Sequence, residues 1–338
     1  MRRSFKHLLV TGGEGFIGSN FVRFALTKHP RLRITVLDLP TYASAGKNLA
    51  DLKGHSRLEI IGTGVTEQVV GRLARDVDGI VNFAALTHVD RSVLNPTAFI
   101  KTNVVGTAIL LEAARKHNTR MFIHISTDEV YGDVRTRRSR ENDALKPRSP
   151  YSASKAAAEM VVGAYRETYD LPVVVLRGSN MYGPYQFPEK LIPLLITNAI
   201  DGIRLPLYND GSAVRDYLYV ADYCVAVDMA LARAEPGAVY NVATGVRTSG
   251  KQIARRVLEL LGRPLSLIEF VRDRPGHDYR YAPDASRISE IGWKPRHTLD
   301  EGLARTVRWY QEHEDWWRRL KSQEFWEFYR KNYRPLVR

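Results

Sequence analysis

Three glycines, Gly12, Gly15 and Gly18, lie between an apolar run that ends at Thr11 and a helix-like stretch. Glycine lets the backbone turn tightly and approach a pyrophosphate, while the first turn of the helix offers amide donors and a favourable dipole. Asp38 follows about 20 residues later, at the end of a second apolar run, where its carboxylate can bind ribose hydroxyls. This spacing predicts that the chain begins as a dinucleotide-binding βαβ unit.

The residues around Asp38 also indicate which dinucleotide is bound. An aspartate at this position repels a 2′-phosphate, and the following residues, Leu39 and Pro40, include no arginine that could bind one. We therefore expect NAD rather than NADP.

The first half of the chain alternates strand-like and helix-like stretches, the pattern of parallel βαβ units. Strands are predicted at His7–Thr11, Arg33–Asp38, Leu58–Gly62, Gly79–Ala84, Arg120–Ser126 and Val173–Arg177. Helices are predicted at Phe16–Lys28, Thr66–Arg75, Ala98–His117 and Ser152–Tyr169. Because the strands are apolar almost throughout, both faces of the sheet should be covered, which predicts a doubly wound α/β (Rossmann) fold.

After about residue 178 the pattern becomes looser and richer in proline, glycine and tyrosine. Further helices are predicted at Leu191–Gly202, Val220–Ala234, Lys251–Leu261 and Leu299–Leu320. We predict an NAD-binding domain over residues 1–178 that carries the catalytic residues. Residues 179–338 should form mainly a smaller mixed α/β substrate-binding lobe, with some segments returning to the first domain.

Composition indicates an ordinary soluble protein. Of the 338 residues 44% are hydrophobic and 26% are charged, and no apolar stretch approaches the ~20 residues that span a bilayer. The N-terminus runs directly into a strand, so no signal peptide and no membrane association are expected. A single cysteine, Cys224, excludes an internal disulfide and a cysteine metal cluster, so we expect no metal and a cytoplasmic location.

The net charge of +13 raises the question of nucleic-acid binding. The arginines are scattered apart from one local cluster, Arg135, Arg137, Arg138 and Arg140, and no zinc-finger spacing, RNA-binding signature or basic zipper accompanies them. We interpret most of these arginines as solvated surface residues, and we expect no nucleic-acid partner. Some can bind the diphosphate of a small ligand.

Tyr151 and Lys155 lie four residues apart on a predicted helix, so they share one face. A phenol has a pKa near 10, and a nearby ammonium group and the positive charge of a nicotinamide would lower it. Downstream of a dinucleotide fingerprint, this pair indicates alcohol oxidation by hydride transfer.

Asp128 and Glu129 follow the apolar run that ends at Ser126. Neighbours in a regular strand point to opposite faces, but where a strand ends and turns both side chains can approach one ligand. The carboxyl ends of parallel strands are also where such sheets bind ligands. A turn-capping aspartate followed by an exposed glutamate remains the alternative.

With these motifs in place, the chain resembles the dTDP-glucose 4,6-dehydratase family of the extended short-chain dehydrogenase/reductases. The resemblance covers nearly the whole chain, and the Thr127-Asp128-Glu129 triplet is its most specific part, because related 4-epimerases generally lack the acidic pair. It extends over residues 11–18, 88–92, 102–107, 126–132, 151–155, 182–193, 214–220 and 273–278.

The resemblance implies a three-stage reaction on a nucleotide-diphosphate sugar. Tyr151, tuned by Lys155, would take the proton of the C4 hydroxyl while Thr127 hydrogen-bonds that oxygen and hydride passes to NAD. Glu129 would then take the C5 proton that the new ketone acidifies, and protonated Asp128 would release the C6 hydroxyl as water. Return of the hydride to C6 would give a 4-keto-6-deoxy sugar.

The resemblance also implies the remaining binding residues and a homodimer in which the predicted helices Ala98–His117 and Ser152–Tyr169 pair across a two-fold axis. The cofactor would contact Gly12, Gly15, Phe16, Ile17, Gly18, Asp38, Ala84, Asn103, Tyr151 and Lys155. The substrate would contact Thr87, His88, Asn180, Lys190, Leu191, Pro206, Tyr208, Arg215, Arg274 and Tyr281. Arg215 and Arg274 would bind the diphosphate, unless they pair at the surface with Asp216 and Asp273. His277 would be either a ligand contact or a residue that packs its own loop.

Several positions depart from the common pattern of the family. Leu86 and Thr87 stand where Glu-Ser is usual, Asn209 replaces a glycine, and Gly250 stands where an asparagine is expected. Residues 39–40 and 61–65 also differ. These departures affect substrate recognition more than the reaction. The alternatives are therefore a complete or truncated reaction on another nucleotide sugar such as a UDP-hexose, a 4-epimerase, or a non-catalytic NAD-bound or nucleic-acid-binding protein.

Overall fold

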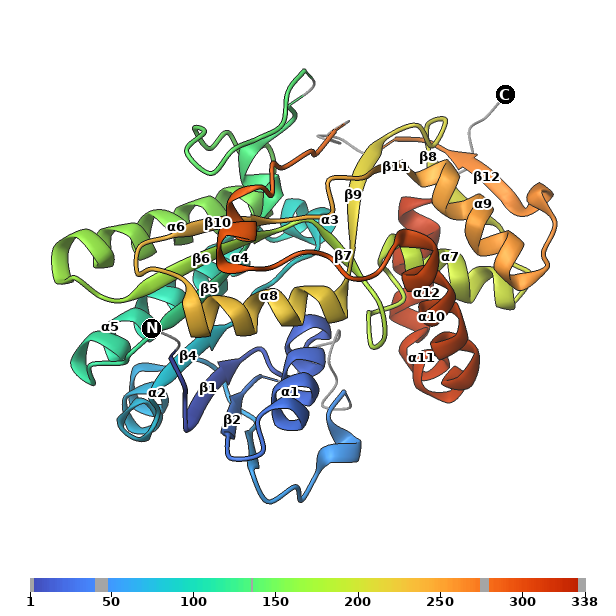
Figure 1. The fold of residues 1–338 in the computed structure, drawn as a ribbon. Coiled ribbons are helices and arrows are strands. Elements are labelled where there is room, and N and C mark those ends of the chain that lie inside the picture. The colour runs from blue at the N-terminus through green and yellow to red at the C-terminus, as the bar shows by residue number, and fades with distance from the viewer. Residues whose placement is uncertain (1–2, 40–47, 135, 274–279, 334–338) are drawn as a thin grey trace.

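The computed structural model describes residues 3–39, 48–134, 136–273 and 280–333, and its main sheet contains seven parallel strands (Figure 1). The strand order is β10-β6-β5-β4-β1-β2-β3. The bounds are β1 (His7–Thr11), β2 (Arg33–Leu37), β3 (Leu58–Ile61), β4 (Gly79–Asn82), β5 (Phe122–Thr127), β6 (Val173–Gly178) and β10 (Val239–Val242). The predicted doubly wound parallel sheet is confirmed, and most predicted strands end within two residues of the observed ends.

Helices cover both faces of this sheet, as the apolar strands require. On one face α1 (Phe16–Lys28) packs against α8 (Val220–Arg233), and on the other lie α2 (Glu67–Leu73), α5 (Gly106–Lys116) and α6 (Pro150–Tyr169) (Figure 1). The largest apolar cluster joins α1 and α8 to the sheet, and a second lies beneath α2, α5 and α6.

The second lobe is mixed α/β and has its own apolar core. One small sheet consists of β7 (Asn180–Tyr182), β9 (Val214–Tyr219) and β11 (Arg247–Ser249), and another pairs β8 (Leu205–Tyr208) with β12 (Ile268–Val271). Its helices are α7 (Leu191–Ile200), α9 (Gly250–Leu261), α10 (Leu299–Glu312), α11 (Glu314–Leu320) and α12 (Gln323–Asn332). The helix predicted over Leu299–Leu320 is thus wrong as a single element, because His313 leaves helical geometry between α10 and α11.

The helical stretch Pro96–Lys116 also differs from its prediction. It begins earlier, because the Asn95 side chain caps α4 (Pro96–Phe99), and it contains a π-helical segment, η3 (Ile100–Val105), before α5. Its length and apolar composition are those of a membrane-crossing helix, contrary to the expectation that no stretch comes close. It packs against α2 and α6, however, as a helix covering the sheet does.

Candidate active site

The glycine turn between β1 and α1 leaves space that no side chain could share. Gly12 has a left-handed φ of +66°, and a Cβ added there would lie 2.6 Å from the Ala84 nitrogen. A Cβ on Gly18 would lie 2.2 Å from the carbonyl oxygen of Gly12. Gly15 caps α1 without a side-chain hydrogen bond, and Phe16 and Ile17 form the first turn, so the helix begins with backbone amides facing the turn. The turn therefore fits a dinucleotide pyrophosphate.

Asp38 lies next to this turn, at the carboxyl end of β2. Its Oδ2 accepts a hydrogen bond of 2.8 Å from the backbone nitrogen of Glu14. Burial raises the pKa of the Asp38 carboxyl to about 6, while backbone hydrogen bonds act in the opposite direction. The structure thus places the Asp38 carboxyl group beside the glycine turn.

Asn103, predicted to contact the cofactor, is buried within η3 and makes protein contacts. Its Oδ1 accepts from the Leu86 nitrogen at 2.9 Å, and its Nδ2 donates to the Leu86 oxygen at 3.1 Å and to the Ser154 hydroxyl at 2.8 Å. The side chain therefore holds the segment that follows β4, including Ala84, against α6.

The acidic pair lies where β5 ends, in the 3-10 turn η4 (Asp128–Tyr131). The Thr127 hydroxyl accepts a hydrogen bond of 3.3 Å from the Glu129 nitrogen and so starts this turn. Asp128 is almost fully buried, whereas Glu129 is partly exposed. Burial, followed by the charges of Glu129 and Asp216, raises the pKa of the Asp128 carboxyl well above its usual range. The Asp128 carboxyl is thus harder to ionise than an ordinary aspartate, and it lies beside a second, partly exposed carboxyl group.

Tyr151 lies in the first turn of α6, which begins with a capping box between Ser149 and Ser152. Burial, and then the charge of Glu129, raises the pKa of the Tyr151 phenol, while a hydrogen bond with the Thr127 side chain lowers it. The structure thus brings Thr127, Asp128, Glu129 and Tyr151 together from the ends of β5 and α6.

Lys155 lies one turn further along α6, and its Nζ donates to the carbonyl oxygen of Ile125 at 2.5 Å. Burial lowers the pKa of the ammonium group to about 8, and the carboxylate of Glu159 opposes this shift. The lysine is therefore anchored to β5.

A buried ion pair beside these residues was missed by the sequence analysis. Arg177 donates from Nε and Nη2 to the Glu159 carboxylate, with a shortest distance of 2.7 Å, and from Nη1 to the Tyr131 hydroxyl. Because Tyr131 ends η4, this pair supports the turn that carries Asp128 and Glu129. Its partners are widely separated in the chain, so no local pattern could have revealed it.

The predicted substrate contacts lie mainly on the second lobe. Arg215, on β9, is buried with its guanidinium 4.5 Å from the centre of the Tyr281 ring, and its charge reaches Asp128. Asp216 does not form a surface ion pair with it, because the buried Asp216 carboxylate accepts hydrogen bonds from Ser179, Thr244 and Gly245. Arg274 and His277 lie outside the described residues.

The other predicted contacts lie in three places. Lys190 donates to the Thr87 carbonyl oxygen at 3.2 Å, Leu191 begins α7, and His88 lies 3.1 Å from the Glu189 carboxylate. Pro206 and Tyr208 lie on β8, where the Tyr208 ring stacks on Tyr333. Asn180, on β7, has a buried Oδ1 without a hydrogen-bond partner among the described residues.

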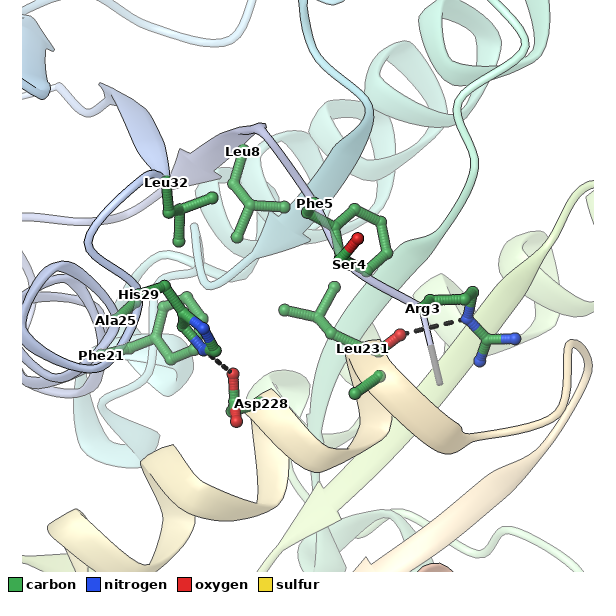
Figure 2. A pocket seen from close by; sticks show the side chains of 11 residues that line it. Arg3, Ser4, Phe5, Leu8, Phe21, Ala25, His29, Leu32, Asp228 and Leu231 are labelled. Carbon is green, nitrogen blue, oxygen red and sulfur yellow. Dashed lines mark hydrogen bonds and ion pairs between the residues drawn. The ribbon is translucent and has the colours of Figure 1, made fainter. Parts of the chain in front are cut away.

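A separate cavity of about 260 Å³ lies between the start of β1, α1 and α8. Figure 2 shows its largely apolar walls, including Phe5, Phe21 and Leu231, and the contact between His29 and Asp228. The His29 Nε2 and Asp228 Oδ1 atoms are 2.6 Å apart. None of the predicted site residues lines it. It has no part in the site described above.

Comparison with known proteins gives a consistent result. A family model for GDP-mannose 4,6 dehydratase matches residues 9–306. The dTDP-glucose 4,6-dehydratase of Streptomyces antibioticus is 42% identical over 322 residues, which cover 94% of this chain and 96% of that protein. The low-salt glycan biosynthesis protein Agl12 of Haloferax volcanii is 46% identical over 304 residues, which cover 90% and 98%.

The similar solved structures include dehydratases and epimerases. The dTDP-glucose 4,6-dehydratase of Streptomyces venezuelae, solved with NAD and TYD bound, has a TM-score of 0.91 and 43% identity, covering 93% of this chain and 100% of that one. The UDP-glucose 4-epimerase of Thermotoga maritima, solved with UDP-glucose, has a TM-score of 0.84 and 28% identity, covering 90% and 99%. The fold alone therefore does not separate the two reactions, and the residues at the end of β5 must do so.

Proposed function

Because this chain belongs to the GDP-mannose 4,6-dehydratase family, we propose that it is an NAD-dependent 4,6-dehydratase of a nucleotide-diphosphate hexose, with dTDP-glucose as the preferred substrate. The observation that carries the proposal is the acidic pair, in which a buried Asp128 with a raised pKa adjoins a partly exposed Glu129. A 4-epimerase has no step that needs both a proton donor and a second carboxylate base at this point.

The residues at the site divide the reaction among themselves. Bound NAD would supply the hydride acceptor for C4 of the sugar and, once reduced, the hydride donor for C6. Tyr151 takes the proton of the C4 hydroxyl, Thr127 hydrogen-bonds the same oxygen, and Lys155 favours the tyrosinate through its positive charge. Glu129 removes the C5 proton, and Asp128 donates its proton to the departing C6 oxygen.

The positive charge of bound NAD has a defined task in this scheme. Burial and Glu129 hold the pKa of Tyr151 above its usual value in the protein without cofactor. The positive charge that a bound nicotinamide would supply near the phenol would oppose both effects, so we expect Tyr151 to be an effective base only with the cofactor bound. Gly12, Gly15, Gly18 and Asp38 would hold that cofactor.

We place the substrate between the two lobes. Arg215 lies close enough for its charge to reach Asp128, so a diphosphate bound there would set the hexose beside the acidic pair. Lys190 would provide a second cation, and Thr87 and His88 would border the sugar. Arg274 would also bind the diphosphate.

The proposal is tested by incubating the protein with a panel of nucleotide hexoses in deuterated water. We expect a 4-keto-6-deoxy product that carries deuterium at C5, with fastest turnover of dTDP-glucose. Faster turnover of a UDP-hexose would correct the substrate alone. An inverted C4 without deuterium at C5 would show an epimerase. Failure to convert any hexose, together with tight RNA binding, would support a non-catalytic protein.

We also propose a homodimer formed by η3, α5 and α6. The segments η3 and α6 lie against each other, yet they expose Ile100, Val105 and Met160, the last to 60%. Apolar side chains exposed side by side commonly mark an interface. Sedimentation should give a dimer, and Met160→Glu should shift it towards the monomer. A Leu260→Glu substitution on exposed α9 is the matched control and should leave the dimer intact.

A cytoplasmic location completes the proposal. Cys224 is buried inside α8, where burial raises the pKa of its thiol, so it is protected rather than paired. Such a thiol suits a reducing compartment. Fractionation of the source cells should find the protein with the soluble contents, and its recovery in a membrane pellet would contradict this placement.

A further inference from the structure

Glu189 occupies a buried position between the two lobes, directly before Lys190 and α7. Its side chain is only 2% exposed. Its Oε1 accepts a hydrogen bond of 3.1 Å from Arg91 Nε, and its Oε2 accepts one of 3.1 Å from Arg91 Nη2. The Nε2 of His88 lies 3.1 Å from the same carboxylate. One carboxylate thus binds two side chains that come from the segment around α3 (Val89–Leu94).

Helix α12 adds a third element to this contact. The Arg91 guanidinium lies 5.1 Å from the centre of the Phe328 ring, and the His88 ring meets the same phenyl ring edge-on at 5.4 Å. Arg91 Nη1 also lies 3.4 Å from Glu324, but Glu324 is 68% exposed and should contribute little. We call His88, Arg91, Glu189 and Phe328 the Glu189 cluster.

The cluster fixes two segments that the proposed function assigns to substrate binding. His88 is held directly by the carboxylate. Lys190 is the next residue after Glu189, and its Nζ donates to the carbonyl oxygen of Thr87 at 3.2 Å. The segment around His88 and the segment of Glu189 and Lys190 are therefore joined twice. The first link is the buried pair of Glu189 with Arg91, and the second is the hydrogen bond from Lys190, the proposed diphosphate contact.

We propose that Glu189 is a positioning residue that sets the distance between the proposed sugar contacts at Thr87 and His88 and the proposed diphosphate contact at Lys190. The bidentate pair with Arg91 fixes orientation as well as distance. A buried carboxylate that loses one partner is left uncompensated, so the arrangement tolerates little movement. This inference rests on the proposed function, since it assumes that a nucleotide hexose spans both segments.

The test compares Glu189→Gln, Arg91→Gln and the double variant with the wild-type protein. Arg256→Gln is the matched control, because Arg256 pairs with Asp300 between α9 and α10, within the second lobe. We expect kcat/KM for the nucleotide hexose to fall by about 10- to 100-fold in each single variant, since small displacements at a reacting centre have effects of that size. The double variant should fall little further than either single one, because one contact is lost in all three. Arg256→Gln should match the wild-type protein.

Two further measurements separate positioning from folding. The bound NAD content and the melting temperature should stay close to wild-type in Glu189→Gln, and affinity for the nucleoside diphosphate alone should fall less than kcat/KM. Turnover equal to wild-type in both single variants would overturn the inference and leave the proposed function intact. If the wild-type protein converts no hexose, the proposed function fails. Nucleoside-diphosphate affinity then decides: a loss in Glu189→Gln and Arg91→Gln, but not in Arg256→Gln, supports the cluster, and unchanged affinity overturns it.

Discussion

The Asp128 carboxyl is buried beside the carboxylate of Glu129, and the charge of Glu129 adds to the burial that raises the pKa of Asp128. Two adjacent residues of similar chemistry thus have different surroundings, which favour the protonated form of Asp128. The difference arises at the end of β5, where the turn η4 encloses the first side chain and leaves the second partly exposed. This division is the basis of the first two predictions.

Replacing Glu129 by Gln should separate oxidation from elimination. Tyr151 remains in place, so C4 should still be oxidised and NADH should accumulate, but without a base for the C5 proton the rate of product formation should fall by about 10²- to 10⁴-fold. NADH absorbance and product mass measure the two steps. The Glu290→Gln substitution, on an exposed residue, is the control. Normal product formation by Glu129→Gln would show that another group takes the proton.

The rate of water elimination should fall on the alkaline side of its pH profile. Since the pKa of Asp128 is raised, its carboxyl stays protonated at a pH where an ordinary aspartate is ionised, and the proton donor is lost only as the pH rises through that higher pKa. The water-elimination step should therefore slow at high pH. In Asp128→Asn this step should be slow at every pH, while NADH still forms. An elimination rate that keeps rising with pH would contradict the assigned role.

Replacing Asp38 by Asn should stabilise the cofactor-free protein and weaken NAD binding. The pKa of Asp38 is about 6 in the folded protein against a usual 3.8, so the folded state binds this proton more tightly. Its ionisation therefore lowers stability as the pH rises from about 4 to about 6. At pH 7 Asp38→Asn should gain about 1–3 kcal/mol in free energy of unfolding, and near pH 4 the difference should vanish. Thermal melts at both pH values and titration with NAD measure this, and an equal effect at both pH values would argue against it.

Replacing Gly18 by Ala should disrupt the turn between β1 and α1. The added methyl group would lie 2.2 Å from the Gly12 oxygen, so the backbone must move, at a cost of about 3 kcal/mol. Bound NAD should be lost as well. Gly71→Ala on α2 is the control, since its methyl group meets no atom within 4 Å and alanine favours a helix by up to about 1 kcal/mol. Denaturant unfolding and cofactor content distinguish the two variants.

Much of the first domain could be predicted because its signals are local. The strand before Gly12 and the helix after Gly15 have the predicted bounds, since apolar runs and a glycine turn define them within a few residues. The capping box of Ser149 and Ser152 likewise marks the start of α6 near its predicted position.

The missed features depend on partners that are distant in the chain. The short strands β7, β9 and β11 pair with one another across long loops, so no periodic pattern reveals them. The hydrogen bonds between the Asn103 amide and the Leu86 backbone were likewise not predicted, because only the folded chain brings the two residues together. The same is true of Glu189, whose neighbours His88 and Arg91 lie on another element.

The position of β10 in the main sheet affects how such an enzyme can be divided or recombined. Val239–Val242 pairs with β6 although β7, β8 and β9 of the other lobe precede it in the chain. A gene fragment ending after Gly178 would therefore encode a sheet with an unpaired apolar edge and without α8, which covers one face. Exchange of the substrate lobe between relatives should succeed only if every crossing of the chain between the two lobes is kept. New substrate specificity in such enzymes should then evolve by substitutions within loops rather than by exchange of whole domains.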